Sequence, residues 1–76
     1  MRIINFKGQR NKVTIETDQG LFIGYGDLLP DGFLVFSDSV TDHEGTPLTP
    51  EQYAQLKAAG RNFLLENDME VQLFFE

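Results

Sequence analysis

The residue types that could do chemistry are concentrated between Asp38 and Glu44. Asp38, Asp42, His43 and Glu44 combine three carboxylates with the one imidazole of the chain. Such groups can ligate a divalent cation or transfer protons. Their spacing, however, matches no EF-hand loop, zincin helix or two-histidine carboxylate site. We therefore predict no catalytic residue, no metal ligand and no cofactor.

A structural role is the main alternative for this stretch. Ser, Asp and Thr side chains in connections commonly accept hydrogen bonds from nearby backbone N–H groups as turn and cap residues. On this interpretation the stretch is a solvated connection, and its capping residues are Ser37, Asp38, Ser39 and Asp42.

Other catalytic signatures are absent from the sequence. The glycines of Gly24-Tyr25-Gly26-Asp27 are not followed by a helix pattern whose N-terminus could hold a phosphate. One histidine and no cysteine exclude a Cys–His pair, and there is no Gly-x-Ser-x-Gly sequence. We expect a protein that is not an enzyme, with an enzyme built on the Asp38–Glu44 stretch kept as a third hypothesis.

The segment Thr49 to Asn67 is the one stretch with helical periodicity. Thr49 is a suitable N-cap, Pro50 suits the first helical position, and Gln52 can complete a capping box. The apolar stripe consists of Tyr53, Leu56, Ala59, Gly60, Phe63 and Leu64. A glycine on this stripe indicates close approach of the helix to a sheet. We expect the helix to end at Asn67 or Asp68.

The rest of the chain has strand and turn patterns. We predict strands at 2–7, 12–18, 21–26, 33–36 and 69–76, with Phe33–Phe36 as the central strand because it is apolar throughout. The predicted connections are a four-residue hairpin loop (8–11), two turns (19–20 and 28–32) and a long irregular segment (37–48). The order ββββαβ predicts a single α+β domain over residues 1–76, with an antiparallel sheet of about five strands and one helix on one face.

Length and charge narrow the possible partners. A chain of 76 residues without cysteine holds one modest core. Its formal net charge of −6 disfavours nucleic acid and anionic membranes, and favours a basic partner, although such acidity can also serve solubility alone. No apolar run approaches the ~20 residues of a membrane span, and no signal peptide pattern is present, so we predict a cytoplasmic protein.

Seven phenylalanines are many for so small a core. Neighbours such as Phe33 and Leu34, or Phe74 and Phe75, point to opposite faces of a strand. If the helix covers one face only, the other face presents an apolar patch suited to a homodimer or a partner protein. The alternative is a sheet curled enough to bury both faces.

The last part of the chain contains several segments that occur together in a known protein family. These segments are Gly26-Asp27-Leu28-Leu29, the run from Gly32 to Val40 that contains Phe36-Ser37-Asp38-Ser39-Val40, the helix start Thr49–Tyr53, and the final amphipathic strand. Together they cover roughly the last two-thirds of the chain, and they resemble the family called immunity protein 74. Members of this bacterial family are predicted to neutralise a toxin of contact-dependent or polymorphic toxin systems that is encoded beside them.

The resemblance implies an immunity protein that binds a cognate toxin, and the acidic charge fits a basic toxin. Asp38, Asp42, His43 and Glu44 are then the predicted contacts with this partner. The alternative hypothesis is a structural or oligomerisation module that self-associates through an exposed sheet face.

Overall fold

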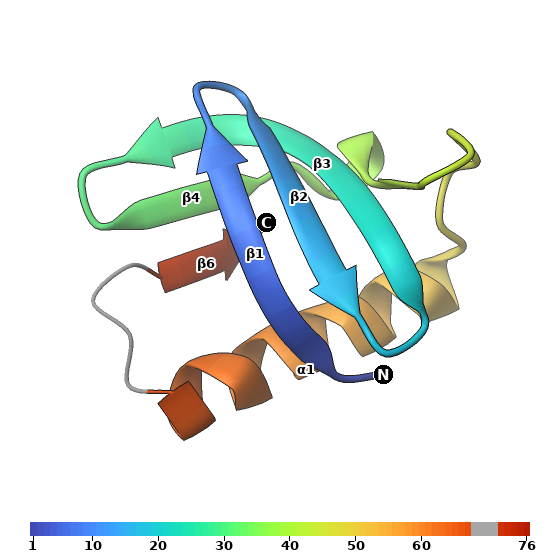
Figure 1. Ribbon diagram of the computed structural model, residues 1–76. Helices are drawn as coiled ribbons and strands as arrows, with labels where there is room; N and C mark the ends of the chain where they lie inside the picture. Colours follow the sequence, from blue (N-terminus) through green and yellow to red (C-terminus); the bar gives the residue numbers. More distant parts are fainter. Residues whose placement is uncertain (68–71) are drawn as a thin grey trace.

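The computed structural model describes residues 1–67 and 72–76 (Figure 1). The elements in chain order are β1 (Ile3–Gln9), β2 (Lys12–Thr17), β3 (Gly20–Leu29), β4 (Gly32–Val35), a 3-10 turn η1 (Ser37–Ser39), β5 (Thr41–Asp42), α1 (Pro50–Asn67) and β6 (Gln72–Phe75). The predicted α+β class is confirmed. No helix in the described part of the chain is long and apolar enough to cross a membrane.

The sheet is mixed, so the prediction of a purely antiparallel sheet was wrong. Its strand order is β1-β2-β3-β4-β6, and β5 pairs separately with β3. Four of the pairings are antiparallel, but β4 and β6 are parallel. The chain leaves β4, passes through α1 and returns in the same direction, which is the connection that a parallel pair requires. The central strand is β3 rather than β4.

The long strand β3 curls the sheet (Figure 1). Its first part pairs with β2 up to Tyr25, and its last part pairs with β4 from Gly26 onwards. A Cβ atom on Gly26 would collide with the backbone carbonyl of Leu34, and one on Gly24 would lie 3.0 Å from Cγ1 of Val35. Both glycines therefore allow close approach of neighbouring groups where the strand changes partners.

The helix begins as predicted. The Thr49 hydroxyl accepts a hydrogen bond from the N–H of Gln52 at 3.2 Å, and the Gln52 side chain accepts one from the N–H of Thr49 at 2.9 Å. This pair is a complete capping box. The described helix ends at Asn67; Asp68, the other predicted end, lies outside the described residues.

The helix packs on the concave side of the sheet, against β1 and β6. Four residues of its apolar stripe are buried, namely Leu56, Ala59, Gly60 and Phe63. A Cβ atom on Gly60 would lie only 2.5 Å from Cε2 of Phe75, which confirms the close approach predicted from this glycine. The rings of Phe6 and Phe63 meet edge to face, with centroids 5.9 Å apart. The core beneath the helix includes Val13, Ile15, Phe22, Phe33, Val35, Val40 and Leu73.

Several predicted boundaries were wrong. The first strand continues to Gln9, because Gly8 and Gln9 pair with Val13 and Lys12, and the turn is only Arg10-Asn11 with Arg10 at φ 48°. The third strand likewise continues to Leu29, which leaves a turn at 30–31. For the last strand, the described part is Gln72–Phe75; the predicted start at 69–71 lies outside the described residues.

The outer face of the sheet is partly apolar. Leu21 and Tyr25 of β3 are 44% and 45% exposed, whereas Leu34 and Phe74, which pair across β4 and β6, are half-buried. Every phenylalanine is buried or half-buried. Curling therefore shields the phenylalanine rings, while the side chains of Leu21 and Tyr25 on β3 remain accessible.

Candidate functional site

The predicted site residues lie in the connection between β4 and α1, which is more ordered than its sequence indicates. Its first part is the 3-10 turn η1. The Ser39 hydroxyl oxygen accepts a hydrogen bond from the N–H of Tyr25 at 2.9 Å. It also lies 2.9 Å and 2.6 Å from the carbonyl oxygens of Tyr25 and Phe36, to which its proton can be donated. Ser39 thus attaches the connection to the middle of β3.

The second part is a tight turn built around Asp42. One carboxylate oxygen of Asp42, Oδ1, accepts hydrogen bonds from the N–H groups of Glu44 at 2.9 Å and Thr46 at 3.0 Å. The backbone adds a bond from the N–H of Asp42 to the carbonyl of Thr46, and Gly45 takes the left-handed φ of 86°. The turn is anchored to the sheet because Asp42 pairs with Phe22 of β3.

The four predicted contact residues therefore differ in what their side chains do. Asp42 is half-buried and its carboxylate holds the turn, which is the capping role that the alternative interpretation assigned to it. His43 and Glu44 are exposed at the tip, where Nε2 and Oε1 lie 3.6 Å apart. Asp38 is exposed in η1. Within residues 1–67 and 72–76, no three His, Cys, Asp or Glu side chains are placed to hold a metal ion together.

We call the group Asp38, His43 and Glu44 the acidic turn surface. The turn with His43 and Glu44 lies near the start of β3, because β5 pairs with Phe22 and Ile23. Asp38 lies in η1, whose Ser39 is bonded to Tyr25 in the middle of the strand. On the outer face, exposed Leu21 pairs across with Glu16 of β2. The apolar side chain of Leu21 and the exposed carboxylate of Glu44 are thus found in the same part of the molecule.

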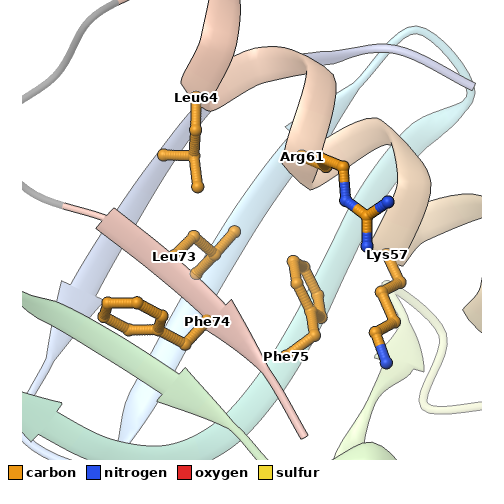
Figure 2. Close-up of a pocket in the computed structure, with 6 residues that line it drawn as sticks. All are labelled: Lys57, Arg61, Leu64, Leu73, Phe74 and Phe75. Atoms are coloured by element: carbon orange, nitrogen blue, oxygen red, sulfur yellow. The ribbon is translucent and has the colours of Figure 1, made fainter.

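A second surface, which the sequence did not reveal as a site, lies between α1 and β6 (Figure 2). Here an open pocket of about 240 Å³ is lined by Lys57, Arg61, Leu64, Leu73, Phe74 and Phe75. Lys57 and Arg61 are the two basic residues of α1 and, being four positions apart, share one side of the helix. Figure 2 shows both next to Phe75 at the end of β6. In the described part of the chain, neither forms an ion pair with a carboxylate.

The end of β6 is fixed against the helix by Tyr53. Its ring meets that of Phe75 edge to face at 6.0 Å, and its hydroxyl donates a hydrogen bond to the backbone oxygen of Glu76 at 3.3 Å. Burial, with a smaller contribution from the negative charge of Glu76, raises the pKa of Tyr53 above its usual value of 10.0. The neutral phenol is therefore the form that the fold favours.

Comparison with known proteins gives no relative on which to base an assignment. No family model, no curated protein and no solved structure matches this chain. Function must therefore be argued from the two surfaces themselves.

Proposed function

We propose that this chain is an immunity protein that binds and neutralises a basic bacterial toxin through the acidic turn surface. The observation that supports the proposal most is the construction of the turn. The carboxylate of Asp42 accepts hydrogen bonds from backbone N–H groups, and this holds the backbone that carries the exposed residues His43 and Glu44. A contact surface that is ordered before binding loses less conformational entropy when the partner docks.

The net charge of this chain indicates that the partner is basic. The chain carries a net charge of −6, and an acidic protein associates fastest with a basic one, at a rate that falls as salt screens the attraction. The resemblance to immunity protein 74 supplies the class of partner, a toxin encoded by a neighbouring gene. Inhibition of such a toxin by binding alone needs no catalytic group.

The test is association with the product of the neighbouring gene at low and moderate salt. Glu44→Lys should slow association by about tenfold at low salt, because like charges then face each other across the interface. Asp42 is unsuitable for this test, since its replacement would disturb the turn.

Asp31→Lys is the matched control. It makes the same change of charge in the turn between β3 and β4, which lies about 20 Å along β3 from the turn that carries Glu44. Equal rates for Glu44→Lys and wild type, or an equal loss in both variants, would remove the acidic turn surface as the contact. Failure of the neighbouring product to bind at all would remove the immunity proposal.

A second candidate function, self-association, is favoured by the exposed apolar side chains on the outer face. Leu21 and Tyr25 lie on one strand, with half-buried Ile23 between them. A homodimer through this face would be weakened by Tyr25→Lys. Sedimentation equilibrium measures it directly, and a monomer at high protein concentration excludes it.

A further inference from the structure

Beyond the proposed function, the structure points to a second binding surface of opposite charge. We propose that the free edge of β6, together with Lys57 and Arg61, binds an extended peptide segment of a partner in which acidic and apolar residues alternate. The peptide would add to the sheet as a further strand beside β6.

The first step is the hydrogen-bonding capacity of β6. The N–H of Gln72 donates to the carbonyl of Asp31 at 2.9 Å, and the N–H of Glu76 donates to the carbonyl of Val35 at 3.0 Å. Because backbone groups alternate in direction along a strand, those of Leu73 and Phe75 point away from β4. Within the described residues β6 pairs with β4 alone. An unpaired edge of this kind is the template for strand addition.

The second step is the position of the cations. Lys57 and Arg61 lie on the helix beside this edge, at the pocket that Leu73 and Phe75 line (Figure 2). The chain has twelve acidic and six basic residues. Two cations four positions apart, without an ion-pair partner among residues 1–67 and 72–76, therefore mark a local site for negative charge. Their apolar stems can cover the added backbone while the charged ends reach carboxylates.

The third step is the alternation of acidic and apolar residues along the bound peptide. Side chains of the added strand would point in turn toward the helix and toward the outer face. Those on the helix side meet Lys57 and Arg61, and those on the other side meet the half-buried ring of Phe74. Acidic residues therefore suit one set of positions and apolar residues the other.

A second copy of the chain is a less suitable occupant. It would bring a further charge of −6, and its own edge residues from Gln72 to Phe75 contain no carboxylate. The acidic peptide therefore fits the chemistry of the cations better.

The probe is a short fluorescein-labelled peptide of alternating glutamate and valine, titrated by fluorescence anisotropy. Wild type should bind it and should bind the corresponding lysine–valine peptide at least about tenfold more weakly. Arg61→Glu and Lys57→Glu should each weaken binding severalfold, whereas Arg10→Glu, the same type of change in the β1–β2 turn, should not. Absence of binding, or equal binding of the two peptides, overturns the proposal.

Backbone pairing is tested with N-methylated peptides, which leave every protein residue unchanged. In an antiparallel addition the glutamates direct their N–H groups at β6, and in a parallel addition the valines do. N-methylation of one kind of residue, either the glutamates or the valines, must therefore abolish binding, while N-methylation of the other kind is tolerated. If both peptides bind as well as the parent, the edge is not the contact.

Two further measurements distinguish peptide binding at this edge from self-association and from binding of the basic partner. A dimer that Tyr25→Lys leaves intact and that excludes the peptide would show that a second copy occupies the edge, contrary to the proposal. Association with the basic partner of the proposed function should be unaffected by Arg61→Glu, so that the two surfaces succeed or fail separately.

Discussion

The acidic turn surface and the edge of β6 differ in how their polar groups are used. In the turn, the carboxylate of Asp42 and the backbone around it are already hydrogen-bonded to each other, and only the outermost side chains are available. Along β6 the side chains of Leu73 and Phe75 are packed inward, but their backbone groups point away from the sheet. The turn offers charge, whereas the edge offers backbone hydrogen bonds with charge beside them.

This difference determines the kind of partner each surface suits. A surface that offers side chains alone is specific for the shape and charge of a folded partner. A strand edge recognises an extended backbone, and neighbouring side chains select its sequence.

The largest effect is expected from the core that supports both surfaces. Leu56 is fully buried and Phe63 is 7% exposed beneath the sheet. Leu56→Ala or Phe63→Ala should lower the free energy of unfolding by about 2–5 kcal/mol, because each leaves a cavity. Denaturant unfolding measures this loss. Leu65→Ala is the control, since Leu65 is 78% exposed, and it should change stability by less than about 0.5 kcal/mol. Similar small losses in all three variants would mean that the stripe is not core.

A smaller effect should distinguish the carboxylates within the acidic turn. Asp42→Ala removes two hydrogen bonds to backbone N–H groups and should cost about 1–2 kcal/mol. Asp38→Ala should cost less than about 0.5 kcal/mol, since its exposed side chain makes no such bond in the described structure. Asp42→Asn keeps an acceptor oxygen and should recover part of the loss. Thermal unfolding of the three variants checks the order; equal stability for Asp42→Ala and Asp38→Ala would contradict the capping role.

Local patterns predicted the helix well and the sheet less well. The capping box at Thr49 and the stripe through Leu56 and Phe63 are short-range signals, so they could be identified from spacing alone. The parallel pairing of β4 and β6 depends on how α1 returns the chain to the sheet, which no local pattern specifies. The extension of β3 to Leu29 depends on a new partner, β4, taking over at Gly26.

The candidate surfaces were likewise predictable only where they depend on local sequence. The composition of residues 37–48 indicated turns, and the bonds of Asp42 agree with that interpretation. The bond from the N–H of Tyr25 to Ser39 instead reaches across to β3, which the sequence did not indicate. Lys57 and Arg61, in contrast, look like ordinary solvent-facing helix residues in the sequence. Only the tertiary position of α1 beside β6, which in the described part of the chain pairs with β4 alone, connects them with the proposed site.

The next prediction concerns the N-cap of α1 at Thr49, where the connection from β4 ends and the helix begins. Thr49→Ala removes the oxygen that accepts the Gln52 N–H bond and should cost about 1 kcal/mol. Thr49→Ser keeps that oxygen and should stay close to wild type. Amide hydrogen exchange at Gln52 and Tyr53 should rise in Thr49→Ala and remain unchanged in Thr49→Ser. Exchange that is the same in both variants would show that the cap does not hold the first turn.

The smallest effect concerns pH and the anchor at the end of β6. Burial raises the pKa of Tyr53 in the folded protein above its value of 10.0 in the unfolded chain, so the fold prefers the neutral phenol. The corresponding stabilisation is complete below pH 10.0 and declines as pH rises through the folded pKa. Unfolding measured from about pH 8 to 11.5 should therefore show that the advantage of wild type over Tyr53→Phe becomes smaller above about pH 10. The difference between the two proteins is the quantity to follow, because it cancels effects of pH that both share. Tyr25→Phe, which removes an exposed tyrosine of β3, serves as the control. A constant difference across the whole range would show that the phenol of Tyr53 is not shielded where β6 meets α1.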